Sequence, residues 1–344
     1  MKTNITVLII LLFSFYSYSA KEKNTLIQEK TKKKISVIEE FSYEAIEIYG
    51  EVEKGNLKSK RIIKFNKNGD EIENIHYKSD GSFEDKNIWK YDNNGNMIED
   101  IYYITDSTIE TKIIYIHDDN GNEIEENVYN SDGKLVRESN WKYDEKGNVT
   151  EENDNGPDVS FFTKITYKYD EKGSVIESTS YVIEQTSYGE SYEDLGLKFT
   201  YKYDEKGKII EENIYQPEGS LTWKSTSLTK LTYKYDENGK IIEENEYNSD
   251  GSLNWKHTFT YDESGNRIEK HYNKYDGNLS SKRIIRYDEN GNEVETNYYN
   301  SDGSLKSKDT YKYEYDKKGN WIKQISYNDG KPKIITERVV EYYP

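Results

Sequence analysis

Apolar and polar residues alternate along this chain in short runs that are separated by acidic, glycine-containing turns. In the run Leu231–Tyr235, apolar or aromatic residues occupy every second position, and Thr and Lys lie between them. Ile165–Tyr169 and Phe199–Tyr203 repeat this pattern. Because successive side chains of a strand point to opposite faces, a period of two predicts antiparallel strands with one apolar and one polar face.

Each of these runs leads into a recurring motif, aromatic-x-aromatic-Asp-x-x-Gly, of which Trp89–Gly95 and Trp141–Gly147 are clear copies. Most consecutive motif glycines are 26 residues apart. A fixed period of this length indicates tandem copies of one supersecondary unit. The motif glycines are Gly69, Gly95, Gly121, Gly147, Gly173, Gly207, Gly239, Gly265, Gly291 and Gly319. The chain is therefore predicted to contain about ten repeats.

A second turn lies between most of these motifs and reads Asn-Ser-Asp-Gly at Asn248–Gly251 and Asn300–Gly303. Both turns carry Asp or Asn first and Gly fourth, as type I turns prefer. The side-chain oxygen can accept a backbone N–H, and the glycine can adopt the left-handed conformation that closes a three-residue hairpin. Each repeat is therefore predicted to be strand, turn, strand, turn.

The strands that follow the first turn are less regular, and two segments interrupt the period. Ile72 and Ile75 are three residues apart, as are Ile98 and Ile101, which a β-bulge or a strong local twist would each explain. Residues 184–197 and 216–229 lengthen two repeats. We expect these insertions to form loops or lengthened hairpins.

The first 19 residues are predicted to be a signal peptide, because Lys2 precedes an apolar stretch from Ile5 to Tyr16 and small residues follow it. Residues 20–45 form a non-repeat leader, either a short helix or a frayed charged segment. Residues 46–344 form the repeat domain, and its last strand, Ile334–Tyr343, is expected to cap the sheet. No second long apolar run follows. We therefore expect an exported protein, periplasmic, cell-surface or secreted, with no membrane span after signal removal.

The composition bears on the partners of the protein and on how it is stabilised. The formal net charge of −17 repels phosphates, which argues against a nucleic-acid partner. The high charged fraction would be typical of disorder, but 34 tyrosines favour strands and supply large rings to bury. The chain has no cysteine, so packing rather than disulfides must stabilise it.

The repeated unit Tyr-Asp-x-x-Gly-Asn, as at Tyr91–Asn96 and Tyr287–Asn292, resembles the YD repeat of the Rhs family over roughly residues 65–343. In that family the repeats coil as a spiralling β-sheet, and very long arrays form hollow shells around toxic domains. This chain has far fewer repeats, and we find in it no self-cleavage segment and no toxin-like C-terminal domain. The resemblance therefore implies the repeat fold and neither encapsulation nor autoproteolysis.

The predicted fold class is all-β, with tandem antiparallel β-hairpin repeats that form an elongated, curved or spiralled sheet, and whether this sheet closes is left open. Twisted sheets of more than about ten strands curl or fold over. Curling would place the Tyr/Ile face inside and leave Lys, Glu and Thr outside. A membrane-spanning barrel is disfavoured, because its outer face would need an apolar band.

The sequence indicates no enzymatic site. Four histidines are scattered, and the usual nucleophile, zinc and phosphate motifs are missing. The acidic turns lack the ligand spacing of a calcium loop. Carboxylate pairs such as Glu211-Glu212 and Glu243-Glu244 recur in most repeats, which favours solvated strand faces over one acid/base pair. We therefore expect no catalytic residues, no metal and no cofactor.

The preferred interpretation is a binding or scaffolding module at the cell exterior or in the periplasm, with a protein or glycan partner at a cell surface. A repeat sheet offers a long surface, and Trp223, Trp255 and Trp321 are the candidate ligand contacts. The alternative is that these tryptophans belong to the core. A purely structural envelope protein and, less favoured, a glycan-active enzyme with a site near residues 184–197 are the competing functions.

Overall fold

A computed structural model describes residues 35–156, 161–185, 191–216, 226–263, 265–274 and 278–344. Within these ranges every regular element is a β-strand, which confirms the all-β prediction. The predicted signal peptide and residues 20–34 of the predicted leader lie outside the described residues. No helix that the structure describes has the length and apolar character needed to cross a membrane.

The described strands are β1 (Ile35–Ile48), β2 (Glu51–Phe65), β3 (Glu71–Lys78), β4 (Phe83–Tyr91), β5 (Met97–Tyr103), β6 (Ile109–His117), β7 (Glu123–Asn130), β8 (Leu135–Tyr143), β9 (Val149–Asn155), β10 (Phe161–Tyr169), β11 (Val175–Gln185), β12 (Ser191–Tyr203), β13 (Ile209–Gln216), β14 (Thr226–Tyr235), β15 (Ile241–Asn248), β16 (Leu253–Tyr261), β17 (Arg267–Lys274), β18 (Leu279–Tyr287), β19 (Glu293–Tyr299), β20 (Leu305–Tyr315), β21 (Trp321–Asn328) and β22 (Lys331–Tyr342).

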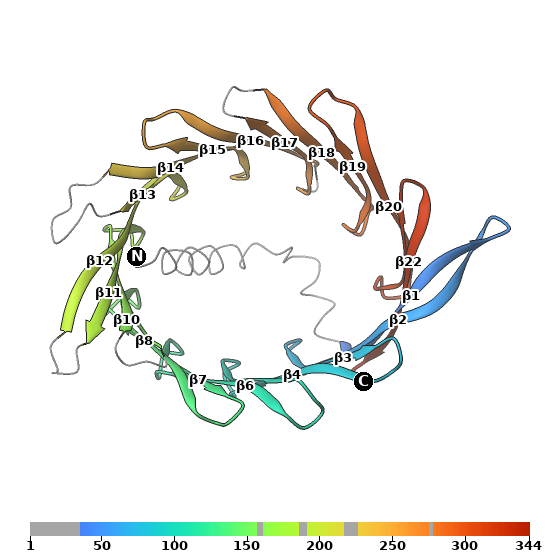
Figure 1. Cartoon of the computed structure of the whole chain (residues 1–344), viewed down its shortest axis with the longest axis horizontal. Coiled ribbons are helices and arrows are strands. Elements are labelled where there is room, and N and C mark those ends of the chain that lie inside the picture. The colour runs from blue at the N-terminus through green and yellow to red at the C-terminus, as the bar shows by residue number, and fades with distance from the viewer. Residues whose placement is uncertain (1–34, 157–160, 186–190, 217–225, 264, 275–277) are drawn as a thin grey trace, which may run out of the picture.

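These strands form a closed antiparallel β-barrel (Figure 1). Each strand pairs with the one before it and the one after it, and β22 pairs with β1 to complete the ring. The prediction of an elongated, curved or spiralled sheet is therefore wrong, although the all-β fold class is confirmed. Closure removes the two free edges that an open sheet would expose.

The strand that closes the barrel comes from a segment that shows no repeat. Residues 35–44 belong to β1. From the sequence, this segment was expected to be either a short helix or a frayed charged segment. Ile38 of β1 pairs with Ile63 of β2 on one side and with Val340 of β22 on the other. The C-terminal strand predicted to cap the sheet therefore joins its two ends.

A small apolar core lies at this seam. Ile35, Ile63 and Phe65 are each 5% exposed, and three partly buried side chains pack against them: Ile38, Val340 and Tyr342. Burial of apolar area is the main favourable contribution to folding. We infer that this cluster supplies much of the free energy that holds β1 between β2 and β22.

The turns have the geometry that the sequence predicts. In the turn after β4, the Asp92 amide donates to the Asn96 carbonyl and the Gly95 amide donates to the Asp92 carbonyl, at 2.9 and 3.2 Å. The Asp92 Oδ1 atom accepts from the Asn94 and Asn96 amides. Gly95 has φ of 91°, a left-handed conformation that glycine adopts without steric cost.

The repeats with isoleucines three residues apart each contain a β-bulge directly after the first turn of the repeat. Lys90 pairs with Glu99 and Tyr91 pairs with Met97, so Ile98 is the extra residue. Ile72 and Ile322 are extra residues in the same way. The bulge, and not strand twist alone, therefore explains the spacing, and it resets the alternation of faces along the strand.

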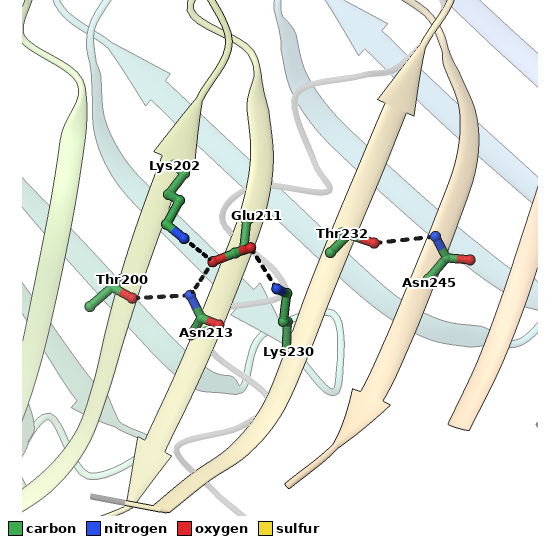
Figure 2. A network of polar contacts seen from close by, with 7 residues as sticks. All are labelled: Thr200, Lys202, Glu211, Asn213, Lys230, Thr232 and Asn245. Atoms are coloured by element: carbon green, nitrogen blue, oxygen red, sulfur yellow. Dashed lines mark hydrogen bonds and ion pairs between the residues drawn. The ribbon is translucent and has the colours of Figure 1, made fainter. Parts of the chain in front are cut away.

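The two faces of the barrel wall differ in chemistry. We call the face that carries Lys202, Glu211 and Lys230 the outer face, because in Figure 2 these side chains lie on the near side of their strands and the opposite wall lies behind. The inner face carries the motif aromatics, such as Tyr201 and Tyr233. This arrangement follows the predicted distribution for the motif aromatics, Lys and Thr, whereas only one member of each Glu pair lies outside.

The insertion at residues 184–197 lengthens a hairpin, since β11 and β12 extend to Gln185 and from Ser191. The second insertion lies partly in β14, which begins at Thr226, and its residues 217–225 lie outside the described ranges.

Candidate binding surface on the inner face of the barrel

The recurring carboxylate pairs split between the two faces of the wall. Glu211 and Glu212 are neighbours in β13, so their side chains point in opposite directions. On the outer face, the Glu211 carboxylate accepts hydrogen bonds from the Lys202 and Lys230 ammonium groups, at 2.6 and 2.7 Å (Figure 2). Burial acts to raise its pKa, but the hydrogen bonds from Lys202, Lys230 and Asn213 prevail and lower the pKa to about 2.

This outer arrangement recurs around the barrel as a cation–carboxylate–cation ladder across three consecutive strands. The central carboxylates of the ladder are Glu99, Glu177, Glu211, Glu243 and Glu295. Amide side chains extend it, since Asn245 donates to the Thr232 hydroxyl at 3.2 Å (Figure 2). Each ladder carboxylate is paired with cations of this chain, so we assign the ladder to strand cohesion.

The second member of each pair forms a row on the inner face, opposite the motif aromatics. Across neighbouring strands the partners in register are Trp89 with Asp100, Tyr115 with Glu126, Trp141 with Glu152, Tyr201 with Glu212, and Tyr233 with Glu244. We call these ten residues the inner row. Each carboxylate therefore lies beside an aromatic side chain, and the row is interrupted at β10 and β11, where Tyr167 pairs with Ser178.

Burial raises the pKa of several inner-row carboxyls. The pKa values of Asp100, Glu152 and Glu212 all lie above the ordinary range, with desolvation as the largest cause. Hydrogen bonds from aromatic side chains act in the opposite direction. The Tyr167 hydroxyl donates to Glu152 Oε2 at 3.0 Å and so favours the charged form. Each of these carboxyls is therefore half-buried beside a polar aromatic group.

The carboxyl of Glu123, at the start of β7, also has a raised pKa. Burial is the main cause, and the nearby carboxylates of Glu126 and Glu152 add to it, which raises the pKa of Glu123 to about 7. Arg137 is bonded to Glu126, and its Nε atom lies 3.8 Å from Asp154 Oδ1. Arg137 is therefore the cation that lies beside the carboxylates of Glu126 and Asp154 on this part of the inner face.

The last tyrosine of most motifs has a structural role. Its hydroxyl donates to a main-chain carbonyl at the start of an earlier strand, as Tyr91 does to Glu71 at 2.9 Å and Tyr169 does to Val149 at 2.6 Å. Tyr143, Tyr203, Tyr235 and Tyr261 make the same type of bond. These bonds join neighbouring repeats near the turns, so we exclude these tyrosines from the candidate binding surface.

The tryptophans singled out in the sequence do not come together. Trp255 stacks on His257 with ring centres 4.3 Å apart. The Arg338 guanidinium lies 3.2 Å from the Trp321 ring centre, and Tyr313 contacts the same ring edge-on. Trp255 lies in β16 and Trp321 in β21, and both are half-buried. Trp223 lies outside the described residues.

Sequence reasoning missed the inner row because it assigned both members of each Glu pair to solvated faces. The signal was present, since adjacent residues of a strand must face opposite sides. The bulge after each turn obscured which member faces inward. Among the described residues, no group of three or more His, Asp or Glu side chains is arranged to hold a metal ion.

Comparisons with known proteins leave the family unassigned. No protein-family model matches the chain, and no curated protein sequence matches it. The YD-repeat resemblance therefore stays a prediction. The TcdB2-TccC3-Cdc42 crystal structure is similar over 88% of this chain, at 12% identity and a TM-score of 0.32, and the match spans 17% of that chain.

Two porin-like proteins are also similar in structure. The one from Bacteroides uniformis ATCC 8492 matches 89% of this chain and 96% of its own, at 12% identity and a TM-score of 0.28. The one from Bacteroides vulgatus ATCC 8482 matches 64% of this chain and 94% of its own, at 13% identity and a TM-score of 0.19. At these TM-scores the likeness carries no functional argument.

Proposed function

We propose that this chain is a binding module whose recognition surface is the inner face of the barrel. The observation that carries the proposal is the inner row, in which five carboxylates pair in register with aromatic residues on β4–β9 and β12–β15. Carboxyls with raised pKa values in a concave wall are candidates for functional groups. Burying them costs free energy that a purely structural wall would avoid.

The chemistry of the inner row suits a protein or a glycan. Carboxylates accept hydrogen bonds from hydroxyl and ammonium groups, and aromatic rings supply flat apolar area with polar edges. The outer ladder offers less to a partner, because its carboxylates are already bonded to lysines and arginines. Its charged side chains also differ from the apolar band that a lipid-facing barrel carries. We place the module in the periplasm or at the cell exterior, as the predicted signal peptide implies.

A capture experiment with face-specific variants tests the proposal. The inner variant combines Asp100→Asn, Glu152→Gln and Glu212→Gln, and the outer control combines Glu99→Gln, Glu151→Gln and Glu211→Gln. The two sets change similar groups at adjacent positions but on opposite faces. Purified mature protein serves as bait for envelope and cell-surface extracts, with mass spectrometry and a glycan array as readouts.

We expect wild type and the outer control to retain a saturable partner and the inner variant to weaken capture at least tenfold. Equal losses in both variants would assign the effect to general destabilisation or to the outer face and would refute the proposal. Wild-type protein that captures nothing selectively would instead support a purely structural envelope role. Thermal unfolding of each variant shows whether the barrel is intact.

A further inference from the structure

The inner face changes character near the seam, where the repeats stop being alike. The register position that holds Glu244 in β15 holds Gln324 in β21, since Tyr233 pairs with Glu244 and Tyr313 pairs with Gln324. In the same register, Tyr311 replaces Leu231 and Ser326 replaces Glu246. In a protein built from repeats, a specific site is expected where the repeated residues are replaced together.

These replacements coincide with a cavity in the barrel wall. It has a volume of about 350 Å³ and lies between β20, β21, β22 and β1. The residues that line it include Ser42, Asp309, Tyr311, Gln324, Ser326 and Thr336. Small-molecule sites occupy a range of roughly 300–1,000 Å³, so the cavity can hold one compact ligand. Because Ser42 comes from β1, the site is complete only in the closed barrel.

Hydrogen bonds hold the polar groups of this cavity in place. Asn328 Nδ2 donates to Asp309 Oδ1 at 2.8 Å. Gln324 Nε2 donates to the Tyr313 hydroxyl at 2.8 Å, which leaves its carbonyl oxygen as an acceptor. Groups that are fixed before binding lose less conformational entropy when a ligand arrives, and this preorganisation favours affinity.

The lining matches an uncharged ligand that carries many hydroxyls. Ser42, Thr336 and Tyr311 provide hydroxyls that can both donate and accept, and Gln324 adds an amide. Asp309 is the carboxylate of the set and can accept from two neighbouring hydroxyls. Lys333 also lines the cavity, so the formal charges of Lys333 and Asp309 offset each other. The Tyr311 ring offers an apolar surface of the kind that stacks on the C–H face of a sugar.

We propose that this seam cavity binds one neutral sugar residue of a glycan. The proposal rests on the proposed function and names the ligand class for the sector of the inner face next to the seam. The lining holds one anion, Asp309, and one cation, Lys333, so its formal charges cancel, and the neutral Gln324 stands where the repeats carry Glu. The neutral sugar is the class that satisfies both observations.

Two substitutions that restore the repeat residues test the site. Tyr311→Leu copies Leu231 and Gln324→Glu copies Glu244, so both variants are compatible with strands of this barrel. The controls lie on the outer face: Tyr299→Leu in β19 makes the same change as Tyr311→Leu, and Thr310→Glu in β20 introduces a carboxylate there, in register with Glu295. Purified mature protein is titrated with glucose, galactose, mannose, N-acetylglucosamine and their disaccharides by calorimetry and saturation-transfer NMR.

We expect at least one neutral sugar to bind saturably, the two cavity variants to bind it at least tenfold more weakly, and the controls to bind as wild type does. Thr336→Val, which removes one hydroxyl, gives a third cavity variant in case either of the others unfolds. Absence of sugar binding in wild type, or equal binding by all cavity variants, would overturn the proposal. If wild-type protein binds no sugar but still captures a partner through the inner row, the proposed function stands and the sugar site is refuted. If wild-type protein neither binds sugar nor captures a partner, both proposals fail.

Discussion

The hydroxyl of Tyr343 donates a hydrogen bond to the main-chain carbonyl of Phe65 at 2.6 Å, between residues 278 positions apart. Elsewhere in the barrel the motif tyrosines make the same type of bond between neighbouring repeats, as Tyr91 does with Glu71. The same type of contact that joins adjacent repeats therefore also joins the C-terminal segment to β2 across the seam.

Replacing Phe65 by alanine should weaken the seam. Phe65 is 5% exposed in the apolar cluster with Ile35 and Ile63. Truncating a buried Phe typically costs about 3–5 kcal/mol. We expect a loss of this size in denaturant unfolding and increased self-association in light scattering, because opened edges can pair with other chains. The control Phe41→Ala, on the outer face beside Lys60, should cost less; equal effects would contradict the role of the seam.

Removing the hydroxyl of a motif tyrosine should have a small, local cost. Tyr169→Phe deletes the bond to the Val149 carbonyl at 2.6 Å, and Tyr91→Phe deletes the bond to Glu71. Each change should lower the free energy of unfolding by about 1 kcal/mol. Because the two sites are several strands apart, the double variant should show the sum. No change in the denaturation midpoint would show that these bonds do not hold repeats together.

The cost of replacing a turn glycine should depend on how well the new residue tolerates a left-handed backbone conformation. Gly95 has φ of 91° and no heavy atom lies within 4 Å of an added Cβ. Gly95→Ala should therefore cost about 1–2 kcal/mol through the left-handed conformation. Gly95→Asn should cost less, because asparagine tolerates that region better. Thermal unfolding of the two variants tests this order, and a larger loss for Asn would point to a steric effect instead.

The raised pKa of Glu123 predicts a stability effect that grows with pH. Burial, with help from Glu126 and Glu152, raises this pKa to about 7 from the ordinary 4.5. Between these values the unfolded chain releases a proton that the folded chain retains, so the free energy of unfolding falls as the pH rises from about 4.5 to about 7. Glu123→Gln should raise the melting temperature at pH 8 and leave it nearly unchanged at pH 4. A gain of similar size at both pH values would contradict this origin.

The outer ladder predicts the opposite dependence on pH. Partial burial acts to raise the pKa of Glu243, but hydrogen bonds from Lys234, Lys256 and Asn245 prevail and lower it to about 2. The stabilisation by its charged form is complete above about pH 4.5 and disappears as the pH falls towards 2. Glu243→Gln should therefore destabilise the barrel at pH 7, less so in high salt, and should have little effect at pH 2. Unfolding scans at both pH values check this, and a pH-independent loss would assign the residue to packing.

Much of the local structure could be predicted from the residues themselves. The alternation in Leu231–Tyr235 identifies a strand, and Asp92 with Gly95 identifies a hairpin turn, because both depend on contacts within a few residues. The candidate site was harder to predict. Glu211 and Glu212 look alike in the sequence, and the bulge that decides which one faces inward is visible only once the strands are paired. Trp255 and Trp321 were chosen for residue type, which says nothing about face or distance.

The sequence by itself determined that this protein is a meander of tyrosine-rich antiparallel strands, because turn chemistry and side-chain alternation are local properties. Only the tertiary structure decided that the meander closes. Closure depends on the curvature accumulated over all the strands and on the pairing of Ile38 with Val340, which no local pattern encodes. It also decided that Ser42 and Thr336 line one cavity, since β1 and β22 become neighbours only when the ring is complete.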